Sequence, residues 1–154
     1  MIITTVKELL EHLYRKGKIK GVMSIEVTSS ARDAAATMSL NRINFIAVTK
    51  RGNFVGVVSS ADTNTEFGSS PRPSERLISD IMTIDVVKVK MEDNVNDLPR
   101  ILTQNKIRHV VVVDNSGHWR GILSSNEVLT AVIANYDEEE LRRAQVLGEL
   151  GHHS

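Results

Sequence analysis

The chain repeats itself, and this internal duplication constrains its fold more than any other feature. An apolar run, a short polar turn and a second apolar run ending in a Gly-containing segment occupy residues 45–62 and return at 109–127. Gly56 and Gly121 hold matching places in the two copies, 65 positions apart. Self-similarity at a fixed period indicates that the fold is built from copies of one supersecondary unit.

The spacing between the copies is not uniform along the unit. Ile43 and Ile107 lie 64 positions apart, so we expect the second copy to carry one extra residue in its turn. Further upstream, residues 22–26 resemble residues 81–85 at a spacing of 59. This match requires a gap of five residues before the helix that follows.

The first copy has the pattern strand, helix, strand, turn, strand, helix. Apolar residues at i, i+3, i+4 and i+7 predict a helix near 31–41, with Ser30 and Asp33 as a capping pair at its start. Two short β-branched runs, 46–48 and 54–58, flank a turn signal and predict a hairpin. A strand and a helix followed by a hairpin and a second helix favour an α+β fold.

The second copy has the same pattern with one irregularity. Val95, Leu98 and Leu102 keep the helical spacing, but Pro99 lacks the N–H that a helix interior needs. We therefore expect this helix to start at Asn96 or to kink. The hairpin is repeated further along, where two apolar runs flank a turn.

Helical segments flank the duplicated unit. Thr5 and Glu8 form a capping box ahead of an amphipathic helix, which needs an apolar surface to lie on. A second charged helix is predicted to begin at Asp137, with an apolar face suited to the body or to a second chain. The predicted organisation is an N-terminal helix and lead-in (1–21), repeat 1 (22–67), a linker (68–77), repeat 2 (78–134) and a C-terminal helix and tail (135–154).

Composition excludes several classes of function. The 19 Lys and Arg balance the 19 Asp and Glu, which argues against a dedicated nucleic-acid or anionic-membrane binder. The absence of Cys excludes disulfide scaffolds, thiol catalysis and Cys-ligated metals. The apolar runs are strand-sized and no signal peptide is visible, so we expect a cytoplasmic protein. No nucleophile, paired acids or metal-ligand spacing indicates an enzyme or a metal site.

The segment from Gly56 to Asp62 resembles the Gly-h-h-Ser/Thr-x-x-Asp signature of cystathionine-β-synthase (CBS) domains, where h is an apolar residue. The segment from Gly121 to Glu127 is similar, except that Glu replaces Asp. The resemblance covers most of the chain. It implies two β-α-β-β-α repeats packed as one pseudo-twofold module, and a regulatory role in binding adenosine-containing ligands without catalysis.

Chemistry favours Asp62 as the centre of such a site. A carboxylate can accept hydrogen bonds from both hydroxyls of a ribose, which would hold and orient the sugar. Ser59 lies where a strand becomes a helix, so its hydroxyl and the free backbone N–H groups can face a phosphate or ribose oxygen. The resemblance implies that an adenine slot is lined across the two repeats by Val57, Thr83, Val86, Ile107 and Arg108.

The same motifs admit a purely structural interpretation. Ser59 with Asp62, and Ser124 with Glu127, are both acceptable capping boxes that satisfy only backbone donors. Capping and ligand binding can coexist, because a ribose would compete for only part of the carboxylate. The repeated Gly and the inter-repeat symmetry favour a ligand site in at least one copy.

The chain departs from the family pattern at the phosphate contacts. The resemblance implies basic residues at the start of a repeat's second strand, facing the phosphates of that repeat's own site. Arg108 and His109 stand there beside Glu127, whereas Asn44 and Phe45 stand beside Asp62. The carboxylate of Glu lies about 1.5 Å further from the backbone than that of Asp, which weakens a two-oxygen grip. The Asp62 site is therefore favoured, and a second candidate site consists of His109, Ser124 and Glu127.

Two functions remain open from the sequence. The first is a non-enzymatic sensor that binds AMP, ADP, ATP or a related compound between its repeats, requires no cofactor, and signals to an effector protein or through its own homodimer. The alternative is a ligand-free interaction module whose exposed apolar helices, at residues 5–14 and 137–150, form a homodimer or dock a partner.

Overall fold

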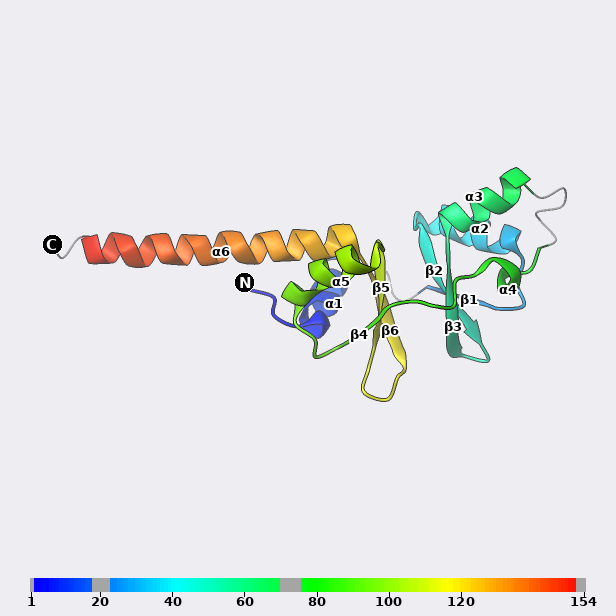
Figure 1. Cartoon of the computed structure of the whole chain (residues 1–154), viewed down its shortest axis with the longest axis horizontal. Helices are drawn as coiled ribbons and strands as arrows, with labels where there is room; N and C mark the ends of the chain where they lie inside the picture. Colours follow the sequence, from blue (N-terminus) through cyan, green and yellow to red (C-terminus); the bar gives the residue numbers. More distant parts are fainter. Residues whose placement is uncertain (1, 18–22, 70–75, 152–154) are drawn as a thin grey trace.

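The computed structural model describes residues 2–17, 23–69 and 76–151. It contains two three-stranded sheets with the same topology, in which the first strand is parallel to the second and the second is antiparallel to the third (Figure 1). The strands are β1 (Ser24–Glu26), β2 (Phe45–Lys50), β3 (Asn53–Ser59), β4 (Lys88–Lys90), β5 (His109–Val113) and β6 (Trp119–Ser124). The helices are α1 (Val6–Arg15), α2 (Ala31–Asn41), α3 (Ser60–Ser69), α4 (Ile78–Ile81), α5 (Leu98–Asn105) and α6 (Ser125–Gly151). The predicted α+β duplication is confirmed.

Up to the hairpin turn, each residue of repeat 1 and its counterpart in repeat 2 differ in number by the same amount. β1 pairs with β2 through Ser24 and Ala47, and β4 pairs with β5 through Lys88 and Val111, both 64 positions further on. The expected match of residues 22–26 with 81–85 is therefore wrong. The counterpart of β1 is β4, which lies nearer to α5. The residues Met82–Val87 between α4 and β4 therefore form no named strand.

Local sequence signals explain the helix starts. The Ser30 hydroxyl accepts from the Asp33 N–H at 3.1 Å and the Asp33 carboxylate accepts from the Ser30 N–H at 3.3 Å, which confirms the predicted capping box of α2. The second repeat instead opens with a 3₁₀ helix, Val95–Asp97, and α5 begins at Leu98 rather than at Asn96. Pro99 falls in the first turn of α5, where a missing N–H costs no intrahelical bond.

The two hairpins differ as the spacing predicts. β2 and β3 are joined by Arg51 and Gly52, both with positive φ (52° and 82°), as a tight two-residue hairpin turn requires. The second turn is longer, and the Asp114 carboxylate accepts from the N–H groups of Ser116 and His118 within it. One extra residue in this turn accounts for the change of offset from 64 to 65.

The segments that lead into the repeats are exchanged between them. The Ala31 N–H at the start of α2 donates to Arg76 O at 2.8 Å, just before α4, and the Val95 N–H donates to Thr4 O at 2.8 Å, just before α1. Ile78 of α4 is accordingly buried in the core of repeat 1. The N-terminal helix packs on the body as predicted, but on repeat 2.

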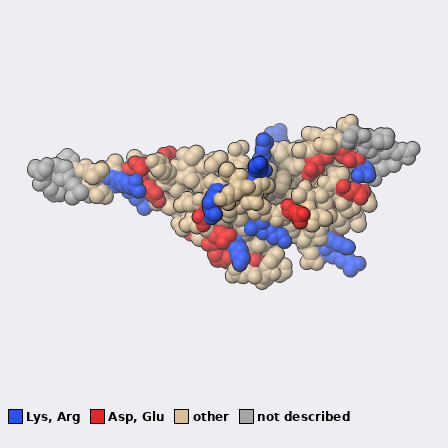
Figure 2. Space-filling view, in the orientation of Figure 1, with Lys and Arg blue, Asp and Glu red and all other residues tan. Residues whose placement is uncertain are grey.

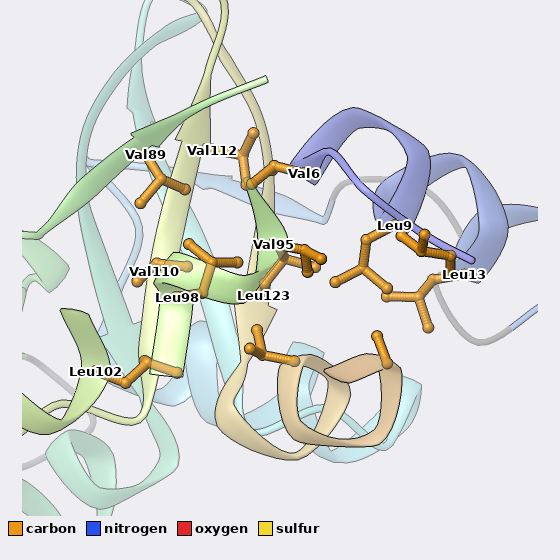
Figure 3. Close-up of a cluster of buried hydrophobic side chains, with 13 residues drawn as sticks. Val6, Leu9, Leu13, Val89, Val95, Leu98, Leu102, Val110, Val112 and Leu123 are labelled. Carbon is orange, nitrogen blue, oxygen red and sulfur yellow. The ribbon is translucent and has the colours of Figure 1, made fainter. Parts of the chain in front are cut away.

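The core of repeat 2 shows this exchange most clearly (Figure 3). One face of α1 is buried against the sheet and the second-repeat helices, and α6 closes the cluster through Val128 and Ala131. The amphipathic pattern of α1 therefore reflects burial within the same chain. The labelled residues of this cluster are Val6, Leu9, Leu13, Val89, Val95, Leu98, Leu102, Val110, Val112 and Leu123.

The C-terminal part of the chain corrects one prediction. No new helix begins at Asp137, because α6 runs without interruption for 27 residues from Ser125 to Gly151. At 1.5 Å per residue it is about 40 Å long, and it extends well away from the body (Figure 1). No Pro lies within α6, so the helix of the second repeat continues directly into the predicted C-terminal helix. Most of the predicted linker, residues 70–75, lies outside the described residues.

The face shown in Figure 2 carries Lys and Arg side chains interspersed with Asp and Glu, and neither sign dominates that face. Within the described ranges, no helix combines the length and apolar character needed to cross a bilayer.

The N-terminal segment is held by one buried amide, which leads to a stability prediction. Asn135 is 4% exposed; its Oδ1 accepts from the Ile3 N–H at 2.8 Å and its Nδ2 donates to Ile3 O at 2.6 Å. Asn135→Ala leaves both backbone groups of Ile3 without this partner and is expected to lower the free energy of unfolding by about 1–3 kcal/mol in urea denaturation. Asn105→Ala is the control, because the exposed Asn105 amide donates only to Ile101 O of its own helix. If both variants lowered the free energy of unfolding equally, the stabilising role of the Asn135–Ile3 hydrogen bonds would be contradicted.

Candidate functional site: the inter-repeat bridge beside Asp62

A short backbone bridge joins the two repeats next to the predicted site. The Val57 N–H donates to Thr83 O at 3.0 Å, and the Thr83 N–H donates to Val57 O at 2.8 Å. A Cβ on Gly56 would lie 2.8 Å from Thr83 O, closer than real side chains approach a backbone oxygen. Gly56 therefore allows the lead-in of repeat 2 to lie directly against β3. The signature Gly is explained by this close approach.

Ser59 and Asp62 form a reciprocal capping box where β3 becomes α3. The Asp62 Oδ2 accepts from the Ser59 N–H at 2.9 Å, and the Ser59 hydroxyl accepts from the Asp62 N–H at 3.2 Å. The Ser60 N–H donates to Asn44 O at 2.9 Å, which ties the start of α3 to the start of β2. Among the described residues, no group donates to Oδ1 of Asp62. One carboxylate oxygen thus caps the helix while the other stays available.

The equivalent position in repeat 2 is arranged more tightly. The Glu127 Oε1 accepts from both the Ser124 N–H and the Ser124 hydroxyl, each at 2.9 Å. The Glu127 N–H in turn donates to the same hydroxyl at 3.2 Å. The longer side chain curls back far enough to bind the serine hydroxyl as well as the backbone. This carboxylate is consequently more engaged with its own cap than that of Asp62.

An aromatic pair lies between the two helix starts. Phe45 and His109 are the first residues of β2 and β5, and their rings stack with centroids 3.9 Å apart and planes 9° from parallel. They face Ser59 and Ser124 in the two ladders, so the stack lies between both capping boxes. Sequence reasoning treated these positions separately. Rings at equivalent places in both copies were the signal that would have paired them.

The electrostatics of this pair are asymmetric because only one ring titrates. Burial lowers the pKa of His109 below its ordinary value of 6.5; Glu127 opposes the shift and Arg108 adds to it. The imidazole is therefore held in its neutral form, which suits stacking against a phenyl ring.

The two sheets pack face to face below this pair. Phe54 and Trp119 hold equivalent places, with ring centroids 6.1 Å apart, in a cluster that contains residues from both repeats. Val57, Val111 and Val113 are its buried members. Paired equivalent residues along one interface show that the repeats are related by a pseudo-twofold axis.

The structure brings together some of the predicted site residues and separates others. Val57 and Thr83 are joined by the backbone bridge, and Val86 packs in the inter-repeat cluster beside Val57. Ile107 instead packs against the core of repeat 2, and Arg108 is exposed, its carbonyl accepting from the Ser125 N–H at 2.8 Å. These two residues lie at the start of β5, on the side of α6. The second set, His109, Ser124 and Glu127, lies together at that same end.

A separate groove lies on the helical side of repeat 1. It has a volume of about 520 Å³ and is lined by α2, the start of β2 and the start of α3, including Arg42, Asn44 and Ser60. Asp62, Val57 and Thr83 do not line it. In the described part of the chain, no group of three or more His, Asp or Glu residues could hold a metal ion.

Comparison with known proteins identifies the family. The CBS domain model matches residues 17–63 and 78–134, more than half of the chain in two copies. This chain therefore belongs to the CBS domain family, and its two repeats form a CBS pair.

Solved structures support the fold across most of the chain. The CBS-domain containing protein from Agrobacterium tumefaciens is similar with a TM-score of 0.72 and 30% identity, covering 84% of this chain and 94% of that one. A CBS domain protein from Pyrobaculum aerophilum, complexed with AMP, matches with a TM-score of 0.72 at 22% identity, over 86% and 98% of the two chains. The second similarity concerns the fold alone.

Curated relatives include much longer proteins. The inosine-5'-monophosphate dehydrogenase of Thermoplasma acidophilum is 27% identical over 113 residues, which are 73% of this chain and 22% of that protein. The homoserine O-acetyltransferase of Methanocorpusculum labreanum is 32% identical over 102 residues, 66% of this chain and 20% of that protein. The chain thus spans about a fifth of each of these relatives.

The close approach at Gly56 leads to a prediction. Gly56→Ala must displace Thr83 and is expected to lower the free energy of unfolding by about 1–3 kcal/mol in chemical denaturation. Gly68→Ala is the control, because a Cβ there meets nothing within 4 Å inside α3 and should raise stability. Unchanged stability of Gly56→Ala would show that the lead-in does not depend on this contact.

The half-buried imidazole of His109 leads to a prediction about pH. Because the folded-state pKa of His109 is below 6.5, the unfolded chain binds more protons in the window just below that value. The free energy of unfolding should therefore fall as the pH drops below 6.5. His109→Phe, which preserves the stack, should remove this part of the pH dependence in urea titrations, whereas His118→Gln in the exposed turn should retain it. If the free energy of unfolding changed with pH in the same way for wild type and His109→Phe, His109 would not be the source of this pH dependence.

Proposed function

We propose that this chain is a non-enzymatic regulatory CBS pair that binds an adenosine-containing ligand beside Asp62. AMP, ADP, ATP or a related compound is the expected ligand, with no cofactor required. Binding would be signalled to an effector protein or through a homodimer of the chain, which we place in the cytoplasm. The observation that carries the proposal is the Val57–Thr83 bridge, which brings the lead-in of repeat 2 against the strand that ends at Ser59.

The chemistry beside this bridge suits a nucleoside. The ribose offers two adjacent hydroxyl donors, and Asp62 offers one carboxylate oxygen outside the capping box and a second that the cap shares. The Ser60 and Asp62 N–H groups at the start of α3 already donate to Asn44 O and the Ser59 hydroxyl, so this helix end would favour a phosphate or ribose oxygen mainly through its partial positive charge. Thr83 and Val86, beside the buried Val57, form the proposed wall of the slot for the base. Ile107 and Arg108 are kept in the proposal only through the family resemblance, because they lie just before β5 at the end of repeat 2 that carries Ser124 and Glu127.

The comparisons supply a second line of support. The similar protein from Pyrobaculum aerophilum was solved as a complex with AMP. Its likeness to this chain is one of fold, and it supports an adenosine-containing ligand for a CBS pair of this shape. His109, Ser124 and Glu127 form the second site of the proposal, with a weaker grip on the sugar because Glu127 is folded onto Ser124.

A thermal-shift titration tests the proposal. AMP, ADP and ATP are added separately, and at least one should raise the Tm in a concentration-dependent manner through preferential binding to the folded state. Asp62→Ala should abolish most of that shift. Asp33→Ala is the matched control, because Asp33 makes the same reciprocal capping bonds at α2. Both variants lose a cap, but only the first loses the ribose acceptor.

The outcomes separate the candidate functions. Absence of a shift with every nucleotide, or an equal shift in Asp62→Ala and wild type, would contradict nucleotide binding at this site. Nucleotide-dependent stabilisation lost in both Asp62→Ala and Asp33→Ala would assign the effect to helix capping instead. ATP hydrolysis abolished by Asp62→Ala would contradict the non-enzymatic role.

A ligand-free interaction module is the second candidate function. Both carboxylates are engaged by their own caps, and the apolar residues Leu141, Val146 and Leu147 are exposed along α6. This alternative predicts an oligomer whose stability is independent of nucleotide, together with no rise in Tm on addition of AMP, ADP or ATP. Truncation of the exposed helix should then dissociate it, as measured by sedimentation.

A further inference from the structure

The outer half of α6 buries no side chain against the body in the described part of the chain. Asn135 is the last buried residue of the helix, and no side chain described beyond it, from Tyr136 to Gly148, is buried. An isolated helix of this length is marginally stable in water, because helix formation has a costly nucleus and little tertiary support here. A partner for this half would supply the missing apolar contact.

One stripe of this exposed helix has the spacing of a helix–helix contact. Ile133, Tyr136, Glu140, Arg143 and Leu147 follow one another at alternating steps of three and four residues. Ile133 is 59% exposed, Tyr136 62% and Leu147 69%, so the apolar members are all accessible. The stripe differs from the face used by the body, which carries Val128, Ala131 and Asn135. Contact with the body therefore leaves the stripe free.

The two charged members of the stripe determine the direction of a partner helix. Glu140 and Arg143 form an exposed ion pair within the helix, with N–O 3.2 Å. In a parallel pair of identical helices in register, Glu140 would face Glu140 and Arg143 would face Arg143. An antiparallel pair centred between them places each Glu140 opposite an Arg143 instead. The same register places Tyr136 opposite Leu147, so that apolar meets apolar and charge meets opposite charge.

Neighbouring antiparallel registers lack this match. A shift by one heptad in one direction places Ile133 opposite Arg143 and Tyr136 opposite Glu140. A shift in the other direction places Arg143 opposite Leu147. Each would set a charge against an apolar side chain, which loses hydration without a compensating partner. Charge complementarity thus selects a second copy of this chain and a single register.

We propose that α6 is a self-association element that pairs antiparallel with α6 of a second copy, with Glu140 opposite Arg143 and Tyr136 opposite Leu147. The overlap from Tyr136 to Leu147 covers 12 residues, about 18 Å of helix, and leaves the two CBS pairs at opposite ends of a two-helix connection. This pairing goes beyond nucleotide binding and does not require it.

Disulfide cross-linking tests the geometry, since the native chain contains no Cys. Tyr136→Cys and Leu147→Cys are prepared as separate full-length proteins, mixed without nucleotide and mildly oxidised. The mixture should yield a covalent dimer and each variant alone should not, because two copies of Cys at the same position lie about 16 Å apart along the antiparallel pair. Leu141→Cys is the matched control: it is 66% exposed and near the centre of the overlap, but off the stripe.

The outcomes are decisive in both directions. Cross-linking of the mixture alone supports the antiparallel register. Cross-linking of Tyr136→Cys with itself, or of Leu141→Cys to the same extent as the mixture, would overturn it, as would no product from the mixture. These results do not depend on nucleotide, so they are distinguishable from failure of the thermal-shift experiment.

Charge reversal provides an independent readout. Glu140→Arg places Arg opposite Arg and should reduce dimer formation in a sedimentation concentration series. Adding Arg143→Glu to that variant restores opposite charges across the pair and should restore the dimer. A double variant that dimerises as poorly as Glu140→Arg would overturn the proposed register. The ion pair within one helix affects helicity, whereas the mass measured by sedimentation reports the contact between two helices.

Discussion

The exchange of lead-in segments is the constraint on which the rest of the molecule depends. Residues just before α1 bond to the start of the 3₁₀ helix in repeat 2, and residues just before α4 bond to the start of α2 in repeat 1. Each small sheet therefore completes its core with chain that precedes the other repeat. The exchange also carries Thr83 across to Val57, which only the absence of a side chain at Gly56 permits. The two cores and the interface between the repeats thus share one set of backbone contacts.

The capping boxes at Ser59 and Ser124 show how one motif takes two forms. At the start of α3, Asp62 uses one oxygen to cap the helix, and at the start of α6 Glu127 uses its greater length to bind the Ser124 hydroxyl too. A ligand at the first position meets a carboxylate that is partly committed, whereas a ligand at the second must compete with an additional bond. The stacked rings of Phe45 and His109 lie between the two positions. Glu127 in place of Asp62, and His109 in place of Phe45, therefore make the two equivalent capping positions chemically different.

Several features of the fold follow from local patterns. The duplication, the capping pair at Ser30 and the two hairpins were predictable because periodicity and turn chemistry act over a few residues. The start of α5 was misplaced because a 3₁₀ turn and Pro99 together shift the helix by two residues. Asp62 and Ser59 were identified from the sequence, and their proximity is local. The contact between Phe45 and His109 joins positions 64 apart, which no local pattern contains.

The sequence by itself determined the repeated unit, its α+β character and the capping residues Thr5, Ser30 and Ser59 at the starts of α1, α2 and α3, because these depend on hydrogen bonds and apolar spacing within short segments. Only the tertiary structure decided which repeat each lead-in helix covers, since α1 has the same amphipathic pattern whichever sheet it packs on. It also decided that α6 continues through Asp137, because an acidic residue is compatible with both a helix start and an exposed helix interior. The physical reason is that burial depends on neighbours that are remote in the chain.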